Sequence, residues 1–135
     1  MTGLPRALVE TAFGIATVDL EEDELVSLEP GDPLVRPGVE GLGLPRLVAA
    51  DAHGSRVVAV VDTKPPLVVS DDAGATWREA GAGLPPGTAV AISGDHPDLV
   101  LFASDTRIFL STDGARFWRA LEPELAGITA LAWEE

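Results

Sequence analysis

The sequence contains no cysteine, no tyrosine, no asparagine and no glutamine, and only one methionine and one lysine among its 135 residues. Without cysteine the chain can form neither a disulfide nor a thiolate nucleophile. The scarcity of thermolabile residues favours a heat-adapted, thermostable protein. No apolar run approaches the roughly 18 residues that a membrane span needs, and the first residues do not resemble a signal peptide. We therefore expect a cytoplasmic protein that does not associate with membranes.

Positive charge is also scarce. The chain has 22 acidic residues against nine lysines and arginines, for a formal net charge of -13 and a pI near 4.3. Such a surface repels phosphate backbones and anionic lipids, so nucleic-acid binding through a broad basic face is not expected. A cationic partner or a neutral ligand remains open, and the simplest role of the charge is to keep the protein soluble. No sequence pattern points to a cofactor.

What the sequence does contain is a repeat. The tripeptide Gly-Leu-Pro recurs every 40 residues (43 − 3 and 83 − 43), and after the second and third copies four short apolar runs follow in the same order. Runs rich in Val, Ile, Leu and Phe that end at Gly, Pro, Asp or Ser are typical of β-strands, and none keeps a helical period over a helix length. Four strands in about 40 residues is the pattern of β-propeller blades. The expected repeats are 3–42, 43–82 and 83–122.

One stretch in the second repeat is distinctive. Ser70–Trp77 reads SDDAGATW, and Ser111–Trp118 reads STDGARFW at nearly the same place in the third repeat. The first repeat offers a degenerate version with Ser27, Glu29 and Gly31. The intact stretch resembles the Asp-box, Ser-x-Asp-x-Gly-x-Thr-Trp, of BNR-repeat β-propellers. Proteins of this kind include sialidases, sortilin-type receptors and a photosystem assembly factor, so the resemblance implies a fold and does not select a function.

The resemblance implies structural roles for the box residues. In that family the box is the hairpin between the third and fourth strands of a blade. Aspartate there is expected to accept hydrogen bonds from the turn, and glycine to supply positive φ. Tryptophan is expected to pack in the core, with glycan stacking as its alternative role. The box residues in the second and third repeats are Ser70, Asp72, Gly74, Thr76, Trp77, Ser111, Asp113 and Trp118.

The sequence gives little support for a catalytic function. Sialidase chemistry uses a tyrosine nucleophile, which this chain lacks, and an arginine cluster, whereas its arginines are mostly scattered at strand ends and turns. A glycosidase with two carboxylates stays open, although no pair stands out. The acidic run Asp19–Glu24 is expected to be a solvated hairpin loop, with a weak cation site as the alternative. His53 and His96 lack the spacing of a zinc site and are expected to be ordinary turn residues.

The sequence thus predicts an all-β protein of three four-stranded propeller blades, with an extra strand within 127–135. For function we expect a non-catalytic interaction or scaffold module. The alternative is a carbohydrate-directed protein, a lectin or a two-carboxylate glycosidase, with Trp77 and Trp118 as candidate glycan contacts. Three blades cannot close a ring, so we expect a homodimer that forms a six-bladed ring, in which the C-terminal strand is exchanged between the chains.

Overall fold

The computed structural model describes residues 4–36, 38–39 and 41–134, and the secondary structure assigned within them is entirely β. The prediction of an all-β chain is therefore confirmed. The strands, in chain order, are β1 (Arg6–Thr11), β2 (Gly14–Asp19), β3 (Glu24–Glu29), β4 (Leu47–His53), β5 (Arg56–Val61), β6 (Leu67–Ser70), β7 (Arg78–Ala80), β8 (Ala89–Ile92), β9 (Val100–Ala103), β10 (Arg107–Ser111), β11 (Arg119–Glu124) and β12 (Ala130–Glu134). Among these described residues no helix is long and apolar enough to span a membrane.

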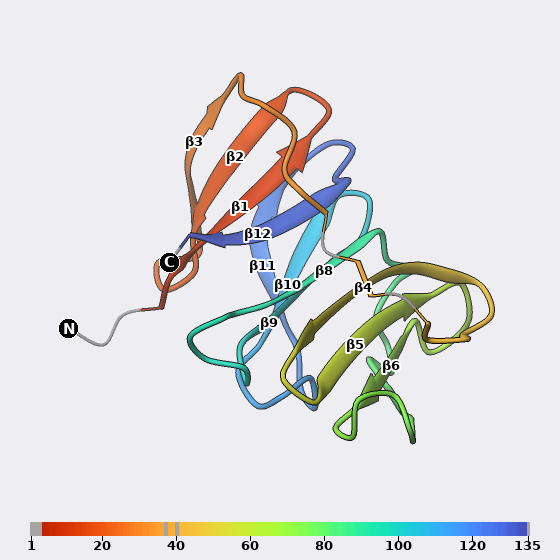
Figure 1. Ribbon diagram of the computed structural model, residues 1–135. Coiled ribbons are helices and arrows are strands. Elements are labelled where there is room, and N and C mark those ends of the chain that lie inside the picture. The colour runs from red at the N-terminus through yellow and green to blue at the C-terminus, as the bar shows by residue number, and fades with distance from the viewer. Residues whose placement is uncertain (1–3, 37, 40, 135) are drawn as a thin grey trace.

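The strands form three antiparallel sheets of four strands each (Figure 1). Sheet A has the order β12-β1-β2-β3, sheet B the order β4-β5-β6-β7, and sheet C the order β8-β9-β10-β11. Sheets B and C are simple meanders, in which each strand pairs with the next through a short turn. Strands β4–β7 lie within 43–82, whereas β11 runs past the expected end of the third repeat, from Arg119 to Glu124.

Sheet A joins the two ends of the chain. β12 pairs with β1 along five residues, from Arg6 opposite Glu134 to Glu10 opposite Ala130. Thr129 extends this pairing, since its amide donates to the Glu10 carbonyl and its hydroxyl donates to the Glu10 carboxylate. The first repeat supplies only three strands, so the C-terminal strand completes its sheet within the same chain. The prediction of an extra strand after the third repeat is therefore corrected, because this strand belongs to the sheet of the first repeat.

Sheet C lies between the other two sheets and packs on both faces. One core joins sheets A and C, where Val9, Val18, Leu101 and Ile108 have no exposed surface. A second core joins sheets B and C around Phe102, which is likewise fully buried. Side chains alternate between the faces of a strand, so β9 can contribute Leu101 to one core and Phe102 to the other.

The prediction of propeller blades is wrong for the chain as a whole, because the three sheets do not close into a ring. Sheets A and B contact sheet C but share no core with each other among the described residues. The connection between them, residues 30–46, is much longer than the connections 81–88 and 125–129 that join the other sheets. Three sheets are too few for the last to return to the first.

Arginine side chains form hydrogen bonds between neighbouring sheets. Arg78 at the start of β7 donates from Nη2 to the carbonyl of Gly114 in sheet C at 2.9 Å. Arg119 at the start of β11 repeats this contact 41 residues later, with Nη2 donating to the carbonyl of Leu20 in sheet A at 3.1 Å. Both carbonyls lie in the hairpin that precedes the outer strand of the neighbouring sheet, so the pattern Trp-Arg marks a contact between sheets.

Candidate functional site

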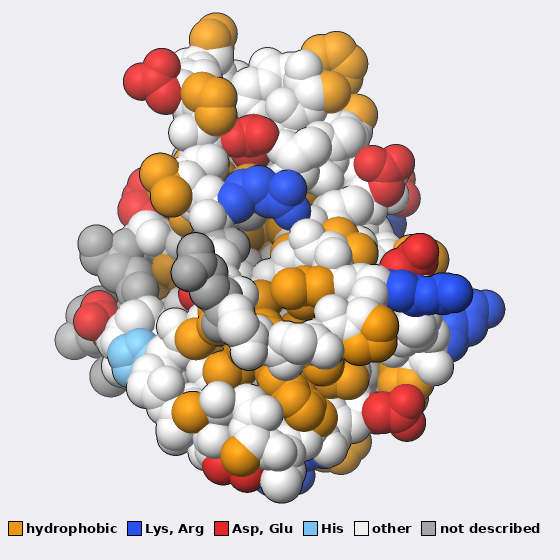
Figure 2. Space-filling view, turned by 45° about the vertical axis from the view of Figure 1, so that its right-hand side comes forward, with side chains coloured by type: hydrophobic (Ala, Val, Ile, Leu, Met, Phe, Trp, Pro, Cys, Tyr) orange, Lys and Arg blue, Asp and Glu red, His pale blue; other side chains and the backbone are white. Residues whose placement is uncertain are grey.

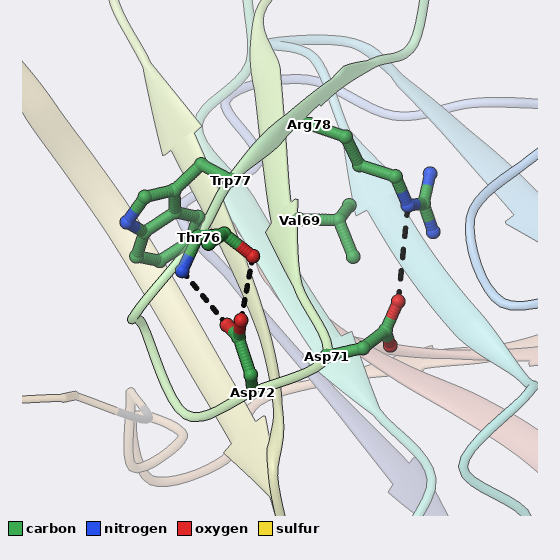
Figure 3. A pocket seen from close by; sticks show the side chains of 6 residues that line it. All are labelled: Val69, Asp71, Asp72, Thr76, Trp77 and Arg78. Atoms are coloured by element: carbon green, nitrogen blue, oxygen red, sulfur yellow. Dashed lines mark hydrogen bonds and ion pairs between the residues drawn. The ribbon is translucent and has the colours of Figure 1, made fainter.

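The two box hairpins are built by the same hydrogen bonds. Between β6 and β7, Ser70 Oγ donates to Asp72 Oδ1 at 2.7 Å and accepts the Gly74 amide at 2.8 Å. Asp72 Oδ1 accepts the Thr76 amide at 2.8 Å, and its Oδ2 accepts the Thr76 hydroxyl (Figure 3). These side-chain hydrogen bonds join residues at most four positions apart, and the Ala73 amide adds a distant contact by donating to the Ser55 carbonyl at 2.8 Å.

The hairpin between β10 and β11 repeats this geometry with one change. Ser111 Oγ donates to Asp113 Oδ1 at 2.8 Å, and the Phe117 amide donates to the same oxygen at 3.0 Å. Two successive residues have positive φ in each hairpin, Ala73 and Gly74 in the first and Gly114 and Ala115 in the second. The glycine can therefore stand at either position, which explains its shift by one place in the third repeat.

The degenerate box of the first repeat lies elsewhere. Ser27 and Glu29 belong to β3, and Gly31 follows that strand. The hairpin of sheet A is the acidic run between β2 and β3, where Asp19 Oδ1 accepts the amides of Glu21 and Glu22 at 3.0 Å each. The prediction of a box at Ser27 is therefore wrong. The Glu-Pro-Gly-Asp-Pro sequence has box-like spacing, but it leads from the end of β3 into the connection to sheet B.

Hydrogen bonds set the acidity of the box aspartates. The Thr76 hydroxyl, the Thr76 amide and the Ser70 hydroxyl together lower the pKa of Asp72 to about 2, from an ordinary value of 3.8. The amide of Phe117 is the largest cause that lowers the pKa of Asp113. Carboxylates held in this way are firmly ionised, so neither is suited to donate a proton near neutral pH.

We expect this ionisation to make stability pH-dependent. A carboxyl whose pKa is lower in the folded chain than in the unfolded chain stabilises the folded state at pH values above the unfolded pKa. This stabilisation is lost as the pH falls through the folded pKa. For Asp72 the loss should occur between about pH 4 and about pH 2. When the urea midpoint of unfolding is plotted against pH, Asp72→Asn should reduce its fall at acid pH. Asp32→Asn, in the exposed connection, should leave that fall unchanged. An unchanged fall in Asp72→Asn would contradict this assignment.

A hollow of about 220 Å³ lies beside the first hairpin (Figure 3). Its walls combine the Trp77 indole with the carboxylates of Asp71 and Asp72 and with Arg78, whose Nε lies 3.9 Å from Asp71 Oδ2. The indole lies close to Gly74, where a methyl group would sit 3.6 Å from Cζ2. An aromatic face beside several polar groups is an arrangement that can bind a small polar ligand such as a sugar.

Trp118 is packed differently. Its half-buried ring meets Phe102 edge to face, with 6.0 Å between the ring centroids, and Phe102 in turn lies 5.8 Å from Phe109. Among the described residues Trp118 Nε1 is buried and has no hydrogen-bond acceptor. The indole therefore contributes to the core between sheets B and C.

The histidines are not brought together. His53 ends β4, and His96 lies in the connection between β8 and β9, where its amide donates to Ser93 Oγ at 3.1 Å. In the part of the chain that the structure describes, no group of three His, Asp or Glu side chains is arranged to hold a metal ion. The acidic run Asp19–Glu24 contains the hairpin between β2 and β3, and no metal-binding group of side chains is found there among the described residues.

Sequence reasoning missed the charged residues that join the sheets. Arg56 on β5 donates from Nε to Asp71 and from Nη1 to both Asp98 and the Pro97 carbonyl, at 2.9 to 3.0 Å. The hydrogen bond with Asp98 is the largest cause that raises the pKa of Arg56. The sequence signal that could have indicated contacts between sheets is the repeated Trp-Arg pair that ends in Arg78 and in Arg119.

Asp51 on β4 was also missed. Its Oδ2 accepts the Ile92 amide from β8 at 2.7 Å, so it joins the inner strands of sheets B and C. Burial is the main cause that raises its pKa above the ordinary value. A lone aspartate in an apolar strand gives no sequence signal of this contact, because its partner is a backbone amide 41 residues away.

Fold and site define an all-β protein of three stacked four-stranded antiparallel sheets with two hydrogen-bonded box hairpins. No protein-family model matches the chain, and no curated protein matches it. Among solved structures, the crystal structure of the GH74 enzyme of Niastella koreensis is similar, with a TM-score of 0.43 and 21% identity. The match covers 89% of this chain and 18% of that enzyme.

Proposed function

We propose that the protein is a non-catalytic interaction module that pairs with a second copy of itself. The observation that carries this proposal is the exposed apolar surface at the margin of sheet B. Leu47 and Val48, at the start of β4, are each 41% exposed, and Val35 in the connection is 90% exposed. Hydrophobic side chains gather on the face that carries sheet B, which is turned forward in Figure 2. Clustered exposed apolar residues mark interaction surfaces.

The arrangement of the sheets supports a second copy as the partner. Sheet C has a neighbour on both faces, whereas sheets A and B each have one. Leu47 pairs with Val61 and lies on the face of sheet B that points away from sheet C, since Val60 points into the shared core. Two copies that place sheet A of one beside sheet B of the other give every sheet two neighbours, in a ring of six sheets about a twofold axis.

The polar residues of the box hairpins favour a non-catalytic role. Asp72 and Asp113 each accept several hydrogen bonds from their own hairpin, and Arg78 and Arg119 fasten one sheet to the next. Groups used in this way are not available as acid, base or nucleophile without loss of the local structure. We also propose that the chain is related to the Asp-box, or BNR, repeat proteins, which the recurrence of the Ser-Asp hydrogen bond in both box hairpins supports.

The hollow beside Trp77 favours a second candidate function, carbohydrate binding. The Trp77 indole on one side of the hollow offers a stacking surface, and Asp71 and Arg78 on the other side offer hydrogen-bonding groups for sugar hydroxyls. The hollow holds only about 220 Å³, which suits a single sugar ring better than an extended chain. We rank this candidate second, because the Asp72 carboxylate that borders the hollow is already occupied by Thr76.

Light scattering on the purified protein tests the proposal. We expect a dimer mass whose population rises with added salt, because each copy carries a formal charge of -13 that salt screens. Leu47→Ser combined with Val48→Ser should yield monomer. Phe117→Ser, at a 79% exposed position in the hairpin between β10 and β11 of sheet C, is the control and should remain dimeric. A monomer at every salt concentration would refute self-association, and saturable binding of a glycan by that monomer, lost in Trp77→Ala, would establish the second candidate.

A further inference from the structure

A second hollow, of about 480 Å³, lies at the outer edge of sheets B and C and differs in character from the one beside Trp77. Its walls come from the connection between β7 and β8, from β10 and from the box hairpin that leads into β11. The side chains that matter are Leu84, Phe109, Arg116, Phe117, Trp118 and Ala120. Five of these six are apolar, and none is acidic.

Two aromatic rings give this groove its apolar surface. Phe117 is 79% exposed, although its own amide is fixed in the hairpin by a hydrogen bond to Asp113. Trp118 is half-buried, and its polar atom Nε1 is turned away from solvent, so the ring offers its hydrocarbon surface. A cavity of several hundred cubic ångströms lined mostly by hydrocarbon is typical of sites for small apolar or amphiphilic molecules.

Arg116 gives the groove its charge. Four arginines form ion pairs with carboxylates, namely Arg56, Arg78, Arg107 and Arg119. Arg116 is exposed and has no ion-pair partner among the described residues. The nearby Asp113 is oriented into the hairpin, where it accepts the amides of Arg116 and Phe117. An exposed guanidinium without a carboxylate partner is therefore available at the rim of the groove.

We propose that this groove binds a small amphiphilic carboxylate, with its hydrocarbon between Leu84, Phe117 and Trp118 and its carboxylate on Arg116. The lining provides hydrogen-bond donors and no carboxylate, so it complements an anion and disfavours a cation. The guanidinium can hold a carboxylate through two parallel hydrogen bonds. This site is independent of pairing between two chains and of the hollow beside Trp77.

Nuclear magnetic resonance tests this proposal, with decanoate as the probe at concentrations below micelle formation. The chain has three tryptophans, so its indole N–H signals report separately on Trp77, Trp118 and Trp133. We expect saturable shifts of the Trp118 signal, with the other two unchanged. Decyltrimethylammonium, which has the same chain length and the opposite charge, should not produce saturable shifts.

Two pairs of variants separate the groove from general hydrophobic adsorption. Arg116→Gln should weaken decanoate binding about tenfold, the scale of one charge-assisted bidentate contact, while Arg6→Gln at the exposed start of β1 should not. Phe117→Ala should also weaken binding, while Phe13→Ala, a 73% exposed phenyl group in another turn, should not. Absence of saturable shifts, equal binding of the cation, or full affinity in both groove variants would each overturn the proposal.

Discussion

A chain that ends at Gly127 is expected to lose cooperative folding, the largest effect that we predict. Removal of 128–135 deletes β12 and takes Ile128 and Leu131, each 1% exposed, out of the core between sheets A and C. Loss of one such side chain costs about 2–5 kcal/mol, and a domain of this size has about 5–15 kcal/mol in total. The truncation also leaves the inner edge of β1 without its five-residue partner.

Circular dichroism during heating measures this effect. The full chain should unfold in one cooperative step, whereas the truncated chain should show no transition. A chain that ends at Trp133 is the control. It keeps the Trp133 side chain, whose Nε1 donates to the Ala91 carbonyl at 3.0 Å, and it loses only the exposed Glu134 together with Glu135. A truncated chain that melts within a few degrees of the full one would show that the pairing of β12 with β1 does not hold sheet A together.

Gly87→Ala is expected to destabilise the protein by about 1–3 kcal/mol or more, through overpacking. A Cβ at this position would lie 2.3 Å from Cε2 of Phe102 and 2.9 Å from Cγ1 of Val60. Both side chains are fully buried in the core between sheets B and C, so neither can move aside freely. The cause is steric crowding, because Gly87 is not among the residues with positive φ.

The urea midpoint of unfolding checks this prediction. Gly38→Ala is the matched control, since its Cβ would meet nothing within 4 Å and its φ is not positive. A second variant, Phe102→Leu, should reduce the cost of Gly87→Ala, because it removes the ring atoms that the new methyl group would meet. Additivity of the two substitutions would contradict the contact, since residues that touch should show a coupling energy.

Much of the local structure could be predicted from the sequence. Runs such as Val57–Val61 and Val100–Ala103 are strands because β-branched and aromatic residues between turn signals favour extended backbone. The hairpins at Asp72 and Asp113 follow from hydrogen bonds that span four residues or fewer. These features depend on near neighbours in the chain, and a sequence pattern contains those neighbours.

The sites were less predictable. The prediction of a box at Ser27 is wrong because box-like spacing does not by itself make a hairpin. The turn in sheet A is formed by Asp19, which accepts the amides of Glu21 and Glu22. The sequence did not indicate a groove at Arg116 and Phe117, since Leu84, in the connection between β7 and β8, reaches them only through the packing of sheets B and C. A site assembled from separate strands has no fixed spacing in the sequence.

The sequence by itself determined the strands, the box turns and the acidic surface, because each depends on composition or on contacts within a few residues. Tertiary structure alone decided that β12 completes sheet A, since any free strand edge offers the same backbone groups and only packing of Leu131 against sheet C selects this one. It also decided that the three sheets stack without closing into a ring. Closure of a ring depends on how many sheets are present and on their mutual packing, and a 40-residue repeat specifies only the single sheet.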